Sequence, residues 1–228
     1  MPGGPAISIK RAAKLRTKKH REAERLFLAE GTAVLAEAPT TPLHVFDREE
    51  QISRVSTLET PAGPVGVFPF LDVTVTGLLS RAQRILLLHG VQDPGNVGTA
   101  IRSAHAFGAG VVVSRGCADL YNPKTVRASM GSIFHTPVAR DLESVEFLDA
   151  ASQAGFALIA AVPEAEEPPG NMPAGRLVVC IGAEGSGLPE GVVRACKFRV
   201  GIPSLAPSLN ASVAASILLY EAYSRVLG

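Results

Sequence analysis

The chain has 228 residues, 46% of them hydrophobic, so it can bury the core of one large domain or of a small and a medium domain. Its formal net charge of +1 indicates no class of partner by itself. No apolar run approaches the roughly 20 residues of a membrane span, and no apolar secretory signal is present. Three cysteines, an odd number, argue against a disulfide framework, so we expect a cytoplasmic protein. Because no membrane span is expected, we also expect no membrane partner.

Positive charge is concentrated at the N-terminus. Residues 1–21 contain seven basic and no acidic residues, whereas the remainder carries fifteen basic and twenty-one acidic residues. Such asymmetry favours contact with a polyanion, the alternative being a solvated terminus. We predict one basic helix over 7–25 and assign residues 1–25 to a basic N-terminal extension. The residues that would contact the polyanion are Lys10, Arg11, Lys14, Arg16, Lys18, Lys19 and Arg21.

Residues 26–72 are predicted to form a small α/β unit. Its expected strands are 26–29, 43–46 and an apolar strand that ends near residue 70, and its expected helices are 32–38 and 49–57. Residues 73–83 are more polar and change in composition at Gly77, so we predict a linker there.

From residue 84 apolar runs alternate regularly with helical patterns. The predicted strands are 85–88, 111–113, 133–138, 156–162, 177–181 and 198–202, and the predicted helices include 96–107, 123–129, 144–154 and 208–226. This alternation predicts a mostly parallel sheet with helices on both faces.

Polar and glycine-rich turns follow several of these strands. The glycine turn 182–187 contains one carboxylate, Glu184, and Ser208 and Asn210 stand where the last helix begins. After the first strand, Asn96 is predicted to cap a helix and Arg102 follows six residues later. Since ligands of open α/β sheets bind at strand ends and helix starts, these turns predict a binding site. An ordinary strand–turn–helix unit is the alternative.

The usual catalytic signatures are missing. The sequence has no G-x-G-x-x-G after a strand, no Walker loop, no G-x-S-x-G and no H-E-x-x-H. A standard dehydrogenase or P-loop enzyme is therefore disfavoured. The five histidines and three cysteines lack metal-ligand spacing, so we expect no metal site.

Three stretches resemble the motifs of the SpoU/TrmH family of RNA ribose 2′-O-methyltransferases, within the SPOUT superfamily. In chain order they are NVGTAIRSAHAFGA, CIGAEGSGLP and IPSLAPSLNASVAASILLYE. The segment RTKKHREAERLFLAEG also resembles the L30e-like substrate-binding domain that many members carry. Two features depart from the family: the link 204–207 is short, and the N-terminal domain looks abbreviated.

The resemblance implies a fold and a ligand. The fold would be α/β, with a C-terminal trefoil-knotted α/β-knot domain over 84–228 and a small L30e-like domain before it. S-adenosyl-L-methionine would be the cofactor, without a metal. By motif match the cofactor-binding residues are Gly182, Glu184, Gly185, Ile202, Leu209 and Asn210.

The resemblance also implies an activity. The catalytic residues would be Arg102, Asn96, Ser208 and Asn210. Arg102 would anchor a phosphate and activate the ribose hydroxyl, because a free arginine stays protonated and is a poor base. The acceptor would be ribosomal RNA more readily than transfer RNA, and the enzyme a homodimer built around the knot and the last helix. A non-catalytic RNA-binding or ribosome-assembly factor with this fold is the alternative from a different class.

Overall fold

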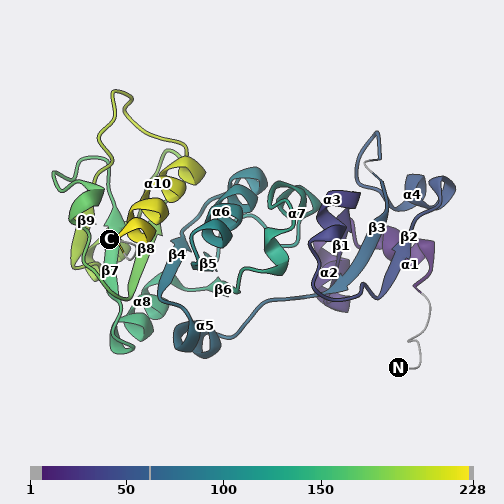
Figure 1. Cartoon of the computed structure of the whole chain (residues 1–228), viewed down its shortest axis with the longest axis horizontal. Coiled ribbons are helices and arrows are strands. Elements are labelled where there is room, and N and C mark those ends of the chain that lie inside the picture. Colours follow the sequence, from purple (N-terminus) through teal and green to yellow (C-terminus); the bar gives the residue numbers. More distant parts are fainter. Residues whose placement is uncertain (1–6, 62, 226–228) are drawn as a thin grey trace.

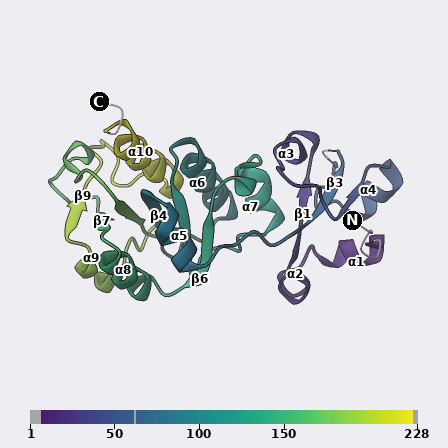
Figure 2. The same ribbon diagram turned by 60° about the horizontal axis from the view of Figure 1, so that its bottom comes forward.

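The computed structural model describes residues 7–61 and 63–225 and shows an elongated molecule (Figure 1). An N-terminal unit, residues 7–70, lies at one end, and a C-terminal unit, residues 84–225, makes up the rest (Figure 2). Within the described part of the chain, no helix has the length and apolar character needed to cross a membrane.

The N-terminal unit is a three-stranded antiparallel sheet, in the order β1-β3-β2, with four short helices. The elements are α1 (Ile9–Lys14), α2 (Lys18–Glu24), β1 (Leu26–Glu30), α3 (Thr32–Ala36), β2 (His44–Phe46), α4 (Glu49–Val55) and β3 (Val65–Pro69). The strands and the helices after residue 26 were predicted in this order, with ends that differ by a few residues. The likeness of this unit to L30e stays a prediction.

The predicted single helix over 7–25 is wrong, because the helix breaks at residues 15–17. The Arg21 guanidinium donates to the carbonyl oxygens of Leu15 and Arg16, 2.8 and 2.9 Å away, which satisfies acceptors that the break leaves open. Leu15 and Ala12 are fully buried in one apolar cluster with Phe46. Ile7, Ala12 and Leu15, which were assigned to an extension, thus belong to the core of the N-terminal unit.

The segment predicted as a polar linker contains a helix, α5 (Val75–Arg81). Thr74 caps it, accepting a hydrogen bond from the Gly77 N–H, and Leu78 is 1% exposed. A Cβ atom on Gly110 would come within 2.4 Å of the Leu78 side chain, so the helix lies tightly against the large sheet. Leu78 belongs to the apolar cluster on one face of that sheet.

The C-terminal unit contains a six-stranded sheet in the order β6-β5-β4-β8-β7-β9, and all five strand pairings are parallel. Its elements are β4 (Arg84–Leu88), α6 (Pro94–Ala106), β5 (Gly110–Ser114), α7 (Pro123–Ala128), η1 (Ser132–Phe134), β6 (Val138–Leu142), α8 (Ser144–Gln153), β7 (Ala157–Ala161), η2 (Pro169–Asn171), β8 (Leu177–Ile181), α9 (Glu190–Ala195), β9 (Phe198–Val200) and α10 (Ala211–Ser224).

Two local predictions in this unit need correction. The run 133–138 was predicted as a strand, but Ser132–Phe134 forms a 3-10 turn and β6 begins only at Val138. Ile133 of this turn is buried in the core, so the turn contains apolar residues although it is not a strand. Sequence reasoning also missed α9. The predicted end of the last helix, with Val226 and Leu227, lies outside the described residues.

Helices cover both faces of the sheet, as predicted. Residues of α6, α7 and α10 share a cluster with Leu86 and Val179, whereas residues of α5, α8 and α9 share one with Leu87 and Val178. Neighbours along one strand therefore face opposite layers, which explains why the strands read as continuous apolar runs. The trefoil threading that the resemblance implies stays a prediction.

The two units share a core. Phe27 and Phe68 of the N-terminal sheet belong to the same buried cluster as Tyr121 and the helices of the C-terminal unit. The Tyr121 hydroxyl donates to Asp72, 2.9 Å away, and accepts the backbone N–H groups of Leu71 and Asp72. Burial and the Asp72 charge raise the pKa of Tyr121, so this hydroxyl stays protonated.

Candidate cofactor and catalytic site

Three loops meet around one cavity of about 760 Å³. They follow β7, β8 and β9, which are neighbours in the sheet, so their carboxyl ends lie side by side. The predicted cofactor-binding residues all line this cavity, together with predicted Ser208: Gly182, Glu184, Gly185, Ile202, Leu209 and Asn210. Residues 163–166 after β7 also line it, and sequence reasoning had not singled them out.

Two glycines allow the loops to approach one another closely. A Cβ atom on Gly182 would lie 2.2 Å from the carbonyl carbon of Gly187 and 2.4 Å from the Leu188 nitrogen. A Cβ atom on Gly201 would lie 2.3 Å from the Ala165 carbonyl oxygen. A larger residue at Gly182 would therefore clash first with its own loop. The backbone at both positions therefore sets the shape of the cavity.

A hydrogen-bonded group joins the first motif to the other two. The Asn96 amide donates to the Glu184 carboxylate, and the Asn210 amide donates to the Asn96 carbonyl oxygen, 3.0 Å away. Ser212 donates to the side-chain oxygens of Asn210 (2.7 Å) and Asn96 (3.3 Å). The structure thus brings together residues about 115 positions apart, and Ser212, two residues after Asn210, is a member that sequence reasoning missed.

The helix caps differ in part from the prediction. Asn96 does not cap α6: Asp93 does, accepting the Asn96 N–H at 3.1 Å, while Lys124 donates to its other oxygen at 2.9 Å. The hydrogen bonds from Lys124 and from the Asn96 N–H lower the pKa of Asp93. Asn210 caps α10, accepting the Ser212 and Val213 N–H groups. Asn96 keeps its side chain for the polar group because Asp93 takes over the cap.

Arg102 stands apart from this group. It is exposed on α6, and its guanidinium has no hydrogen bond or ion pair to any other residue that the structure describes. Six residues of helix place it about 9 Å along the axis from Asn96 and about 120° around it. The side chains of Arg102 and Asn96 therefore leave α6 in different directions.

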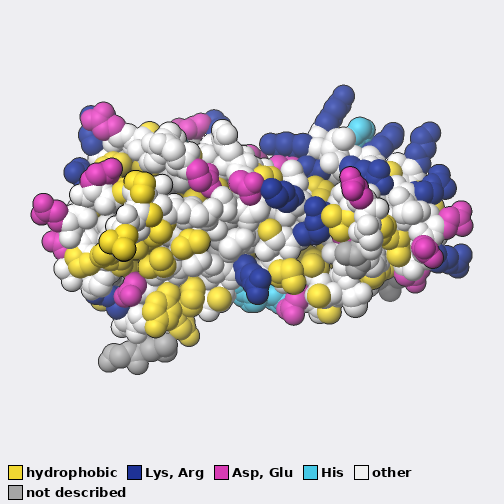
Figure 3. All heavy atoms as spheres, turned by 90° about the horizontal axis from the view of Figure 1, so that it is seen from above, with side chains coloured by type: hydrophobic (Ala, Val, Ile, Leu, Met, Phe, Trp, Pro, Cys, Tyr) yellow, Lys and Arg dark blue, Asp and Glu magenta, His cyan; other side chains and the backbone are white. Residues whose placement is uncertain are grey.

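Six of the seven predicted RNA-binding residues, including Arg16, are exposed, and one, Arg21, is buried. Lys10, Lys14, Lys18 and Lys19 are exposed, and we call them the lysine surface; Figure 3 shows Lys and Arg side chains gathered at this end of the molecule. Arg11 is also exposed but pairs with Glu24 at 2.6 Å. Arg21 is 2% exposed and pairs with Asp119 at 2.5 Å, so its assignment to RNA contact is wrong. The ion pair between Arg21 and Asp119 instead joins the N-terminal unit to the C-terminal unit.

Cysteine and histidine side chains do not assemble a metal site. Among residues 7–61 and 63–225, no group of three or more His, Cys, Asp or Glu side chains could hold a metal ion. Cys180 and Cys196 are buried, with their sulfur atoms 3.7 Å apart, and both belong to the apolar cluster under α9.

Comparison with known proteins agrees with this geometry. The profile of the SpoU rRNA Methylase family matches residues 83–220. The 23S rRNA (guanosine(2553)-2′-O)-methyltransferase RlmP of Bacillus subtilis is 32% identical over 240 residues, which covers 93% of this chain and 94% of that protein.

Two solved structures share the fold of nearly the whole chain. The AdoMet-bound rRNA methyltransferase from Sinorhizobium meliloti has a TM-score of 0.86 at 27% identity and covers 96% of this chain and 95% of its own. The SpoU methyltransferase AviRb from Streptomyces viridochromogenes, in complex with AdoMet, has a TM-score of 0.84 at 25% identity, with 96% and 98% covered. The family profile spans more than half of the sequence. Its second and third motifs line one cavity, and Asn96 of the first motif is hydrogen-bonded to both, so the chain belongs to the SpoU rRNA methylase family.

Proposed function

We propose that the protein transfers a methyl group from S-adenosylmethionine to a ribose 2′-hydroxyl of structured RNA, with ribosomal RNA as the preferred class. The observation that carries this is that the second and third family motifs line one cavity at adjacent strand ends, where Asn96 of the first motif is hydrogen-bonded to Glu184 and Asn210. Similarity over nearly the full length to a ribosomal RNA 2′-O-methyltransferase favours ribosomal over transfer RNA.

The cavity fits the cofactor. Its volume of about 760 Å³ lies within the usual range of small-molecule sites, and its walls combine loop backbone with the apolar side chains Ile202 and Leu209. Apolar walls can hold a flat adenine, and loop N–H and carbonyl groups can orient polar edges. When bound, the cofactor supplies a methyl group that its sulfonium makes electrophilic, which is why no metal is required.

The chain must position and activate a weak nucleophile. Asn96, Glu184, Asn210 and Ser212 hold the turn after β8 and the start of α10 together, so they fix the side of the cavity nearest α6. Ser208 lines the cavity and is exposed, so its hydroxyl can contact the ribose. Arg102 would bind a backbone phosphate and polarise the hydroxyl rather than act as a base.

We propose further that the active form is a homodimer and that Arg102 serves the partner's site. Helices α6 and α10 lie side by side, with the Ser103 and Ser216 hydroxyls 2.6 Å apart. Beside them, Val213 is 47% and Tyr220 55% exposed, so this part of α10 presents apolar surface to solvent. An interface over these helices would bury that apolar surface and carry the exposed Arg102 toward a second copy.

Two alternatives make different predictions. A transfer RNA methyltransferase would share the site but use another RNA, and a non-catalytic assembly factor would bind ribosomal RNA without modifying it. Mapping ribose methylation in total RNA from cytoplasmic extracts, with and without the gene, separates all three. We expect one ribosomal ribose to lose its methyl group; loss in transfer RNA, or no loss, would reject the proposal as stated.

A further inference from the structure

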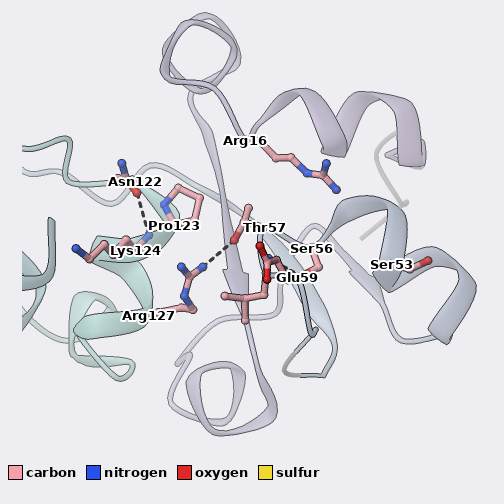
Figure 4. Close-up of a pocket in the computed structure, with 10 residues that line it drawn as sticks. Arg16, Ser53, Ser56, Thr57, Glu59, Asn122, Pro123, Lys124 and Arg127 are labelled. Carbon is pink, nitrogen blue, oxygen red and sulfur yellow. Dashed lines mark hydrogen bonds between the residues drawn. The ribbon is translucent and has the colours of Figure 1, made fainter.

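A second cavity, of about 540 Å³, lies where the N-terminal unit meets α7, and its lining does not overlap that of the cofactor cavity. Figure 4 shows side chains of both units converging there, with Arg127 reaching from α7 to Thr57 of the N-terminal unit. The lining residues are Arg16, Ser53, Ser56, Thr57, Leu58, Glu59, Asn122, Pro123, Lys124 and Arg127.

Three cations, Arg16, Lys124 and Arg127, line the cavity together with one carboxylate, that of Glu59. Lys124 pairs with Asp93, but neither Arg16 nor Arg127 has an ion-pair partner among the described residues. Arg127 is half-buried and donates instead to a neutral hydroxyl, that of Thr57, 2.7 Å away. A half-buried guanidinium that pairs with no carboxylate, in a cavity lined by more cations than carboxylates, favours an anionic ligand.

Both guanidinium groups are held in place and still have N–H groups to offer. Arg16 donates from Nε and Nη2 to the carbonyl oxygens of Val55 (3.2 Å) and Arg54 (2.6 Å), which leaves Nη1. Arg127 uses only Nη1, which leaves Nε and Nη2. Because these side chains are fixed before binding, an anion would cost them little rotamer entropy.

The remaining lining groups suit a nucleotide better than a bare anion. Ser53 and Glu59 are exposed, and Asn122 is half-buried; they bring a hydroxyl, a carboxylate and an amide. A carboxylate repels a free anion but accepts a hydrogen bond from a ribose 2′-hydroxyl or a base amine, groups that an RNA nucleotide presents together with its phosphate.

The cavity is also linked to α6, the helix that carries Asn96, by a hydrogen bond and by backbone contact. Lys124 bonds to Asp93, whose other oxygen caps α6 at Asn96. A Cβ atom on Gly98 would lie 2.4 Å from the Thr125 carbonyl oxygen, so α6 and α7 are in direct backbone contact. A nucleotide held in this cavity would therefore lie at a fixed distance from Asn96.

We propose that this junction cavity binds one backbone phosphate of the RNA substrate, together with the ribose or base attached to it, and so sets the register of the RNA on the catalytic site. The phosphate contacts Arg127, Arg16 adds positive charge to the same cavity, and Glu59 accepts from the nucleotide. This inference rests on the proposed RNA-methylating function and adds to it a site in the junction of the two units.

The test measures RNA affinity of the full chain by fluorescence anisotropy, with a labelled mixed-sequence RNA hairpin as the probe, over a series of KCl concentrations. Replacing both arginines (Arg16→Gln with Arg127→Gln) should weaken binding about tenfold or more. The slope of log affinity against log salt should become shallower by about 1, the loss of one phosphate contact. Calorimetric affinity for S-adenosylhomocysteine should stay unchanged.

Two controls separate charge from folding. Arg81→Gln removes one positive charge at an exposed position of α5, outside the cavity, and should leave the salt slope as in the wild type. Thr57→Val removes the hydrogen bond to Arg127 but keeps the guanidinium, so the slope should also be retained.

The proposal would be overturned if the double variant and Arg81→Gln had the same slope of log RNA affinity against log salt. It would also be overturned if Thr57→Val lost as much RNA affinity as the double variant. A wild-type protein that binds RNA through this cavity but transfers no methyl group would instead reject the proposed function and leave the binding site standing.

Discussion

Replacing Gly182 by alanine should damage cofactor binding through the loop that lines the cavity. An added Cβ atom would lie 2.2 Å from the Gly187 carbonyl carbon, whereas ordinary contact begins at 3.4 Å, so one side of the loop must move by about 1 Å. Residues 184–187 are exposed, so they can yield while the buried strand β8 stays in place. Overpacking of this kind costs about 1–3 kcal/mol.

The expected result is a loss of affinity of about 5- to 150-fold for S-adenosylhomocysteine, measured by isothermal titration calorimetry, with Tm close to the wild-type value. Gly191→Ala is the matched control, because its Cβ atom would meet only Val145, at 4.0 Å, inside the short helix α9. That variant should bind normally and gain about 0.4–1 kcal/mol of stability. Unchanged affinity in Gly182→Ala would refute the reasoning about this loop.

Three more predictions follow from the junction, the dimer and the charged surface. If Arg102 acts across the interface, the variants Arg102→Ala and Asn210→Ala should each be nearly inactive. Mixing the two variants and allowing their subunits to exchange should restore up to about a quarter of wild-type activity. No recovery of activity would place Arg102 in its own subunit's site. Burial raises the pKa of Asp72, but the hydrogen bond from Tyr121 and the charge of Arg140 outweigh burial and leave this pKa lowered. Denaturation at several pH values should therefore show the free energy of unfolding decreasing below about pH 4, and decreasing less steeply in Asp72→Asn. Equal pH dependence of the two proteins would contradict this. Changing the lysine surface to glutamate should weaken RNA binding and flatten its salt dependence without altering cofactor affinity; deletion of residues 1–21 is a poorer test because it removes the buried Ala12 and Leu15.

Periodicity was sufficient to predict most of the large sheet. Its strands are buried on both faces, so runs such as 85–88 and 177–181 are continuously apolar and easy to recognise. Periodicity misplaced the strand at 133–138 because a buried turn such as Ser132–Phe134 uses the same apolar residues as a strand. It also could not reveal that Ala12 and Leu15 belong to a core formed with Phe46, since that core depends on contacts more than 30 residues apart.

The candidate site was predicted by resemblance to motifs, and its geometry required the structure. The motifs pointed to Asn96, Glu184 and Asn210, but the hydrogen bonds among them depend on the order of strands in the sheet. Asp93 competes with Asn96 for the helix cap, and both residue types are good caps, so sequence alone could not choose between them. Arg21 lies in a run of exposed lysines, and only its partner Asp119, 98 residues away, shows that it is buried.

The most direct test of the account is transfer of tritium from methyl-labelled S-adenosylmethionine to deproteinised ribosomal RNA from cells that lack the gene, followed by alkaline hydrolysis. Alkaline cleavage needs a free 2′-hydroxyl, so a 2′-O-methylated ribose remains in an alkali-stable dinucleotide. We predict that the purified protein transfers label, without added metal, and that the label is recovered in such dinucleotides. Label in mononucleotides, which indicates a methylated base, or no transfer to ribosomal RNA, would contradict the account.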